Sequence, residues 1–337
     1  TIMELTLNTI KPGRKKPLCE EDNKLFEFCF TSDVGNDLVM KKIDLENDLI
    51  VETDRDIYIV DNILSFDECE AIRKCMDSCN DISFWNNSVD EADPNSSLKN
   101  LKMFRDAETV EVHSRLIASR IWERLRNCKT CFESNQAFEQ HFQFEFSGDE
   151  VACERELVGQ WTACGINHEL LFAHYPPDGC FAPHTDGRTI HDFNTRSFYS
   201  IIVFLQDLPL TDGGGTRFYA DRAVKELLCK DGRHWTADPA LQVAEVGSVA
   251  GRLLLFHQSL VHEGVPADLT LTKYILRTDL MFRRLPALCD SEQDRLAYAL
   301  FQQAEEVAEA GRVAESIRLF DRALKMSPAM ARVMGQG

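Results

Sequence analysis

From Glu169 onward the chain consists of short apolar runs of strand length, separated by Gly, Pro and Asp. The runs cover residues 170–175, 180–186, 198–208, 214–220, 241–246, 252–258, 261–266 and 273–283. Short strands at regular spacing, with turn residues between them, are typical of a β-sandwich or jelly roll. The pattern therefore predicts an α+β protein with a jelly-roll core at residues 168–285.

Residues 56–167 have a mixed pattern that predicts a helical and strand support for this core. The β-branched run at 57–64 is typical of a strand. Ser65 and Glu68 then form a capping-box pattern that opens a helix over residues 66–79.

A second and longer helix is expected over residues 107–127, with Asp106 as its N-cap. Its predicted apolar stripe has helical spacing and comprises Val112, Leu116, Ile117, Ile121 and Leu125. Residues 1–55 alternate only weakly between charged and apolar positions, and they are expected to form an N-terminal extension of short strands or irregular structure.

After Pro286 the pattern becomes helical, and residues 290–337 are expected to form a pair of helices that turns at Gly311. This pair resembles one tetratricopeptide unit in its small, large and terminating residues, which are Ala304, Val307, Phe320, Ala323 and Pro328. One such unit cannot bury its own apolar face. We therefore expect either that the helices dock on the β-domain or that they belong to a longer repeat array, and in both cases they are a candidate surface for a protein partner.

Composition excludes several classes of protein. The 337-residue chain has a net charge of −18 and a pI near 4.9, so its surface repels phosphate backbones and we expect no nucleic-acid partner. No apolar run is long enough for a membrane span, and the N-terminus has no apolar signal core. Twelve scattered cysteines indicate reduced thiols, and we expect a cytoplasmic or nuclear protein.

Two segments of the β-region, FAPHTDG and LVHEGVP, carry residues suited to metal binding. His184 and Asp186 are two positions apart and share one face of a strand, and His262 lies late in the same series of strands. Two imidazoles and one carboxylate can occupy one face of an octahedral ferrous ion and leave the other positions open. On the last strand Lys273 and Arg277 share a face, and either cation could hold a carboxylate of a bound dicarboxylate.

In these segments the sequence resembles the iron(II)/2-oxoglutarate-dependent dioxygenases, most closely their prolyl-hydroxylase-like branch. The matching segments are HYPPDGCFAPHTDG, SIIVFLQDLPLTDGGGTRFY, GRLLLFHQSLVHEGVP and KYILRTDLMFRR. The resemblance covers roughly residues 56–284, and it is most specific from about residue 168. It implies a double-stranded β-helix core, which agrees with the predicted strands. The predicted N-terminal helices and the C-terminal helical hairpin would flank this core.

The resemblance also implies roles for individual residues. His184, Asp186 and His262 would bind Fe(II). Lys273 stands at the family's position for the cation that holds the distal carboxylate of 2-oxoglutarate, and Arg277 is the competing anchor. Tyr175 matches a tyrosine that lines the cosubstrate pocket, although a β-core aromatic is an equal alternative.

The implied reaction is the hydroxylation of a C–H bond with O2 and 2-oxoglutarate, which releases succinate and CO2; ascorbate is a candidate additional cofactor. The substrate is expected to be a protein side chain such as proline, or a small molecule. Loops at the mouth of such folds determine specificity, here 187–197 and 221–240. The candidate substrate residues are Arg188, His191 and Arg196.

Two alternatives remain. Arg277 and Arg283 have the Arg-x5-Arg spacing seen in alkylation-repair demethylases, which would make the protein an oxidative demethylase. In the second alternative the chain is a non-catalytic interaction protein, in which the tetratricopeptide-like helices bind a partner and the β-domain is a degenerate barrel.

Overall fold

The computed structural model divides the chain into two compact units. The first comprises residues 1–135, 165–187 and 199–280, and the second comprises residues 136–164, 188–198 and 281–337. The structure describes residues 20–30, 38–45, 55–78, 83–84, 102–130, 137–146, 157–225, 227–229 and 232–335. None of the helices in these ranges is both long and apolar enough to cross a membrane.

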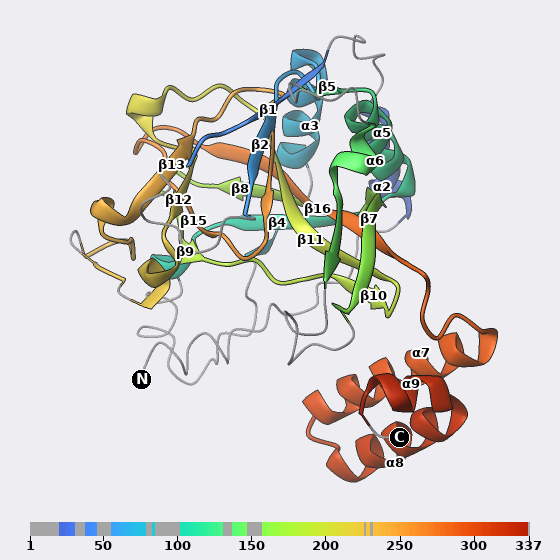
Figure 1. Cartoon of the computed structure of the whole chain (residues 1–337). Helices are drawn as coiled ribbons and strands as arrows, with labels where there is room; N and C mark the ends of the chain where they lie inside the picture. Colours follow the sequence, from blue (N-terminus) through green and yellow to red (C-terminus); the bar gives the residue numbers. More distant parts are fainter. Residues whose placement is uncertain are drawn as a thin grey trace. The chain divides into compact units, whose positions relative to one another are not determined.

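A large curled sheet forms one side of the first unit (Figure 1). In spatial order the strands are β3 (Ser83–Phe84), β4 (Glu108–His113), β8 (Glu169–Tyr175), β16 (Lys273–Leu285), β11 (Thr195–Phe204), β14 (Leu253–His257), β2 (Ile57–Val60), β1 (Val39–Lys42) and β5 (Lys129–Thr130). The pairs β3–β4, β4–β8, β8–β16, β11–β14, β14–β2 and β2–β1 are antiparallel, and β1 and β5 are parallel.

A second, smaller sheet contains four strands, which Figure 1 shows grouped together. Their order is β13 (Gln242–Val246), β12 (Thr216–Tyr219), β15 (Val261–Gly264) and β9 (Phe181–His184). The eight strands predicted from the apolar runs are thus present, four in each sheet. This division of the strands is consistent with the predicted jelly roll.

Apolar side chains from both sheets form one core. Period-two alternation directs Ile202, Leu254 and Phe256 of the large sheet and Phe218 of the small sheet into the same cluster. The rings of Phe218 and Phe256 meet edge to face at 5.2 Å. Because this core joins the two sheets, it places β9 and β15 of the small sheet at a defined position over the large one.

The predicted capping box opens helix α3 (Phe66–Ser78) as expected. The Glu68 N–H donates to Ser65 Oγ at 3.1 Å, and the Ser65 N–H donates to Glu68 Oε2 at 2.9 Å. The Glu68 carboxylate is buried and also accepts from Arg124 Nη2 at 2.7 Å. The cap therefore also ties α3 to helix α5 (Arg115–Arg126).

The single long helix predicted over residues 107–127 is wrong. Residues 108–113 are strand β4, which pairs along its whole length with β8, and α5 begins only after Ser114, whose Oγ accepts from the Ile117 N–H. Val110 and Val112 are β-branched and buried against β8, so pairing with a neighbouring strand outweighs the helical spacing. Helix α2 (Glu20–Phe28) was not predicted within the N-terminal extension.

The second unit contains a small β-region and three C-terminal helices. Strands β6 (Gln143–Phe146) and β7 (Gly159–Ile166) pair antiparallel after the short helix α6 (Phe138–His141), and β10 (Ile190–Asp192) pairs with the start of β11. Phe144 contacts the rings of Phe198 and Phe282 at 4.9 and 5.0 Å. These aromatic contacts form the core of this β-region.

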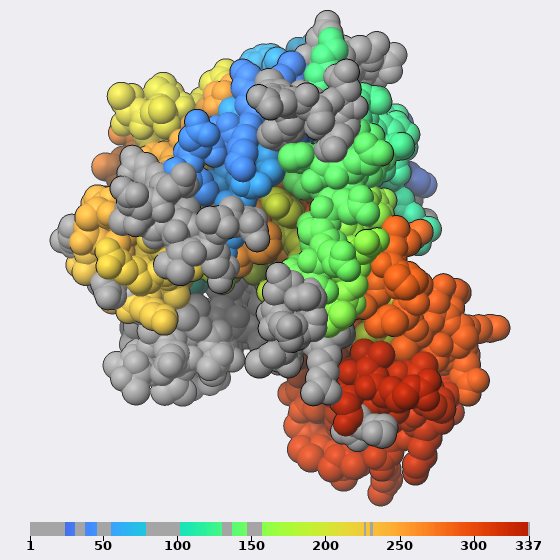
Figure 2. All heavy atoms as spheres, in the orientation of Figure 1, coloured from blue at the N-terminus to red at the C-terminus, as the bar shows by residue number. Residues whose placement is uncertain are grey.

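Helices α7 (Glu292–Glu309), α8 (Val313–Met326) and α9 (Pro328–Val333) form one contiguous group of atoms (orange to red in Figure 2). The turn between α7 and α8 contains Gly311 at φ 76°, as predicted. Ala304 and Ala323 are buried where α7 and α8 pack together. Pro328 begins α9 after the N-cap Ser327.

Replacement of Gly251 by Ala is expected to destabilise the first unit. Gly251 has φ 76°, and an added Cβ would lie 2.1 Å from the Leu64 carbonyl oxygen. Such strain costs about 1–3 kcal/mol, and the clash adds to it. Urea unfolding should therefore show a lower free energy of unfolding for Gly251→Ala. Gly165→Ala is the matched control, because its Cβ would meet nothing within 4 Å; equal effects of the two changes would contradict the argument.

Candidate active site

The three predicted metal ligands come together at one end of the small sheet. His184 ends β9 and pairs directly with His262 on β15, while the Asp186 N–H donates to the Gln258 carbonyl at 3.1 Å. Their candidate ligand atoms all lie within 4.8 Å of one another. The antiparallel register of β9 and β15 thus places two imidazoles beside one carboxylate.

Backbone carbonyls orient both imidazoles. His184 Nδ1 lies 2.7 Å from the Ala182 oxygen, and His262 Nδ1 lies 2.9 Å from the Leu260 oxygen. With the proton on Nδ1 in each ring, each Nε2 carries the lone pair that a metal ion requires. His184 Nε2 lies 3.6 Å from Asp186 Oδ1, and His262 Nε2 lies 3.7 Å from Asp186 Oδ2. A hydrogen bond from the other ring nitrogen to a carbonyl is what typically orients a histidine that binds a metal.

Electrostatic interactions within the group His184, Asp186 and His262 favour the deprotonated forms in which His262 and Asp186 could bind a metal. Burial, together with the nearby His184, lowers the pKa of His262 to about 4, so this imidazole is neutral at pH 7. Burial alone would raise the pKa of Asp186, but Arg277 and the two histidines outweigh it and hold this pKa well below its usual value. Metal ligands must be deprotonated, and these two residues already are.

Arg277 forms ion pairs with two carboxylates. Its Nη2 lies 3.4 Å from Asp186 Oδ2 and its Nη1 lies 3.0 Å from Asp279 Oδ1. Asp279 is fully buried and also accepts from Gln258 at 3.0 Å and from Asn167 at 3.1 Å. Arg277 therefore balances the charge of this carboxylate pair and holds Asp186 in position.

Lys273, the other predicted anchor, has a different environment. Its side chain is buried, and Nζ donates to the Gly215 carbonyl at 3.0 Å and lies 5.1 Å from the centre of the Tyr175 ring. Within the described ranges Nζ forms no ion pair. Burial lowers the pKa of Lys273 to about 7, although Glu263 counteracts part of this effect. A nearby anion would strongly stabilise the charged form of a buried ammonium group in this setting.

Tyr175 is the direct cross-strand partner of Lys273, so β8 and β16 bring the two predicted cosubstrate residues together. Gly264, two positions after His262 on β15, is also close: a Cβ added there would lie 3.8 Å from Lys273 Nζ. Gly264 has no side chain to separate Phe181 of β9 from Lys273 Nζ on the face of β15 that carries His262.

Arg105 belongs to this environment and was missed by the sequence analysis. Its guanidinium lies over the Phe181 ring at 4.6 Å, and that ring stacks on His184 at 3.5 Å. Burial lowers the pKa of Arg105, while Tyr175 and Asp186 raise it in part. No sequence motif contains Arg105. It lies just before the helix predicted at 107–127, where no local pattern indicated a site.

The candidate substrate residues belong to the second unit. Arg188 and His191 are exposed. The expectation of a simple loop over 187–197 is wrong, because these residues include β10 and the start of β11. Arg196 is a buried strand residue whose guanidinium lies 5.5 Å from the Phe198 ring. Contact of these three residues with a substrate stays a prediction.

Comparison with known proteins gave matches only among solved structures. No family model matches the chain, and no curated protein matches it. A viral collagen prolyl hydroxylase from Paramecium Bursaria Chlorella virus-1 is 14% identical, covering 67% of this chain and 96% of its own, with a TM-score of 0.35. A Pseudomonas putida prolyl-4-hydroxylase is 16% identical, covering 68% and 92%, with a TM-score of 0.37.

A third solved structure is HygX from Streptomyces hygroscopicus with nickel and 2-oxoglutarate bound. It is 14% identical, covering 68% of this chain and 83% of its own, with a TM-score of 0.35. At TM-scores this low the similarity does not by itself establish a shared fold or activity. The functional assignment therefore depends on the site.

The affinity of the protein for 2-oxoglutarate should fall as the pH rises above 7. With a pKa of about 7 in the free protein, Lys273 is protonated below that pH and must take up a proton to bind a carboxylate above it. The dissociation constant should therefore rise about tenfold per pH unit above 7 and level off below it. Calorimetric titration with Mn²⁺ bound would measure this slope.

Lys273→Arg is the matched control for the pH dependence. Arginine stays protonated across the range, so the slope from residue 273 should disappear in this variant. Parallel pH profiles for the wild type and Lys273→Arg would contradict the assignment.

Proposed function

We propose that the protein is an Fe(II)- and 2-oxoglutarate-dependent dioxygenase that hydroxylates a C–H bond. The observation that carries the proposal is one site that combines the group His184, Asp186 and His262 with the buried Lys273. Two imidazoles and one carboxylate on one face are the donor set of non-haem Fe(II) oxygenases. When bound, iron would supply O2 activation, and 2-oxoglutarate would supply two electrons and leave as succinate and CO2.

The spacing along β15 suits a short dicarboxylate. His262 and Gly264 are two residues apart, so their Cα atoms are separated by about 7 Å. Lys273 Nζ lies beside Gly264, so a five-carbon keto diacid held by the metal ligands would have its distal carboxylate near this ammonium group. Lys273 would bind that carboxylate, and Tyr175 and Arg105 would contribute to the same environment.

The other residues of the site hold the ligands and exclude water. Ser200 Oγ donates to Asp186 Oδ2, and Arg277 Nη2 contacts Ser200 Oγ at 3.3 Å. Phe256 packs edge-on against His262 at 4.6 Å, and Phe181 covers His184. These contacts limit the rotation of all three ligands, and the aromatic rings make the site less polar, which strengthens its electrostatic interactions.

For the substrate we propose a protein side chain such as proline, on the resemblance of the sequence segments to the prolyl-hydroxylase-like branch. The C-terminal helices are the proposed surface for a protein partner. Leu296, Val313 and Ile317 are apolar residues of α7 and α8 that are more than half exposed, at 59%, 61% and 55%. The described cysteines are free thiols, which supports a reducing compartment such as the cytoplasm or the nucleus.

The demethylase alternative is less well supported. Its two arginines differ in environment, because Arg277 is paired with Asp186 and Asp279 while Arg283 is exposed. The net charge of −18 also opposes binding of a nucleic acid. The non-catalytic alternative would not require two imidazoles, a carboxylate and a buried lysine at one place.

Removal of a metal ligand should abolish iron retention and turnover. Changes next to metal ligands typically cost about 10–100-fold in metal affinity, and loss of a ligand should cost more. Wild-type protein with Fe(II) and 2-oxoglutarate should form succinate, and His184→Ala and Asp186→Ala should not. His257→Ala, on neighbouring β14, is the control. A wild type that neither binds iron nor forms succinate would exclude the enzyme.

Lys273 and Arg277 should differ in what their loss changes. Lys273→Ala removes the charge-assisted bond to the cosubstrate, worth about 1.5–3 kcal/mol, so KM for 2-oxoglutarate should rise about 10–100-fold while iron binding is kept. Arg277→Ala should instead weaken iron retention, because Asp186 loses its ion pair. The reverse pattern in succinate kinetics and iron content would make Arg277 the anchor.

A further inference from the structure

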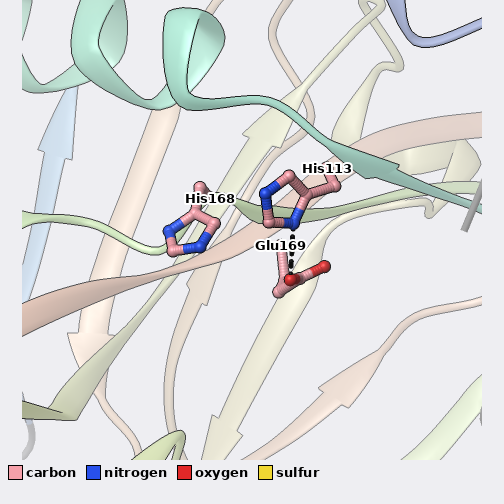
Figure 3. A group of neighbouring side chains, drawn as sticks. All are labelled: His113, His168 and Glu169. Carbon is pink, nitrogen blue, oxygen red and sulfur yellow. Dashed lines mark hydrogen bonds and ion pairs between the residues drawn. The ribbon is translucent and has the colours of Figure 1, made fainter. Parts of the chain in front are cut away.

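A second group of metal-binding side chains lies at the end of the β4–β8 strand pair, outside the site described above. His113 is the last residue of β4, and its direct cross-strand partner Glu169 is the first residue of β8. His168 immediately precedes Glu169. Figure 3 shows the Glu169 carboxylate directed at the His113 imidazole, with the His168 ring next to the His113 ring.

The three side chains are close enough to share one ion. His113 Nδ1 lies 2.7 Å from Glu169 Oε1, and the two imidazole centres are 4.6 Å apart. The candidate ligand atoms of the group all lie within 4.8 Å of one another. Ligands about 2.0–2.2 Å from a tetrahedral zinc ion are about 3.5 Å apart, so small rotations of exposed side chains would complete the geometry.

The backbone that carries these ligands is held rigidly. The Ser114 N–H donates to the His168 carbonyl at 3.0 Å. Asn167 is buried, its side chain donates to Asp279 at 3.1 Å, and its Oδ1 accepts from the Glu169 N–H at 3.2 Å. The turn that places His168 beside β4 is therefore fixed from both sides, so binding an ion here requires no rearrangement of the main chain.

The electrostatic surroundings favour a cation. Ser114, next to His113, donates to the Glu27 carboxylate. Glu111 lies two residues before His113 and so on the same face of β4. The side chains of His113 and Glu169 are 42% and 55% exposed, so an ion from solvent can reach them and water can complete its coordination.

The opposite end of the same two strands provides an internal comparison. Glu108 and His174 are also cross-strand partners, with His174 Nδ1 3.3 Å from Glu108 Oε2. There the neighbouring ring is Tyr274, which stacks on His174 at 5.0 Å. A His–Glu pair thus occurs at both ends of β4–β8, but in the described chain only the His113 end brings a second imidazole to it.

We propose that His113, His168 and Glu169 form a second metal site, which takes Zn²⁺ or a similar borderline divalent ion and clamps the end of β4 to the start of β8. Two imidazoles and one carboxylate suit zinc, whereas Ca²⁺ and Mg²⁺ prefer oxygen ligands alone. The site is independent of the proposed oxygenase centre and leaves one coordination position for water.

The test is equilibrium dialysis of the full chain against Zn²⁺, with metal counted by mass spectrometry. In a His184→Ala/His262→Ala background, which disables the first group, one Zn²⁺ per chain should still bind. Adding His168→Ala should weaken this binding about 100-fold or more. Adding His174→Ala instead should leave the binding of Zn²⁺ unchanged. Both variants keep all of the cysteines, so zinc bound by thiols would be the same in each.

Cobalt gives a second measurement that does not require the disabled background. Wild-type protein should bind two Co²⁺ per chain, and His168→Ala should bind one and lose part of the visible absorption. Circular dichroism without metal should show that His168→Ala is folded. Equal binding by His168→Ala and His174→Ala would overturn the proposal and leave His113–Glu169 as an ordinary hydrogen bond. One ion per wild-type chain that His168→Ala still binds would overturn it as well, whereas one ion that His168→Ala loses would support the second site and contradict the first.

Discussion

The candidate active site depends on the antiparallel register between β9 and β15. This register sets His184 opposite His262, and the register of β15 with its other neighbour, β12, sets Phe218 opposite His262. A slip of one residue would turn one imidazole to the other face of the small sheet and separate the ligands. The core that Phe218 and Phe256 form between the two sheets gives the face that carries His262 its buried apolar environment, so it specifies the register.

The second constraint is the balance of buried charge. Asp186 and Asp279 are two carboxylates in a protein interior, and Arg277 lies between them. Removing one partner of such a group leaves an uncompensated charge, which is costly. This pairing already satisfies Arg277, so the cation with capacity for an added anion is Lys273, which burial holds at a pKa of about 7. Charge balance thus separates the two residues, although both lie on one face of β16.

The two histidine groups differ in what their surroundings favour. Around His184, Asp186 and His262, aromatic rings and Arg277 create a largely buried site that suits chemistry with excluded water. Around His113, His168 and Glu169, two exposed side chains and one half-buried side chain beside a fixed turn suit a structural ion. Asn167 and Asp279 connect the two regions, since Asp279 bonds both Arg277 and the residue before His168.

Local alternation, capping and spacing in the sequence were enough to predict the eight core strands, the start of α3 and the grouping of His184, Asp186 and His262. The sequence could not determine that residues 108–113 form a strand, since only pairing with β8 outweighs their helical spacing. It could not separate Lys273 from Arg277, because the difference lies in partners contributed by Asp186 after β9, by Ser200 on β11 and by the turn at Gly215. Arg105, and the meeting of His113 with His168, were likewise decided only by tertiary structure, which brings together residues that no local pattern connects.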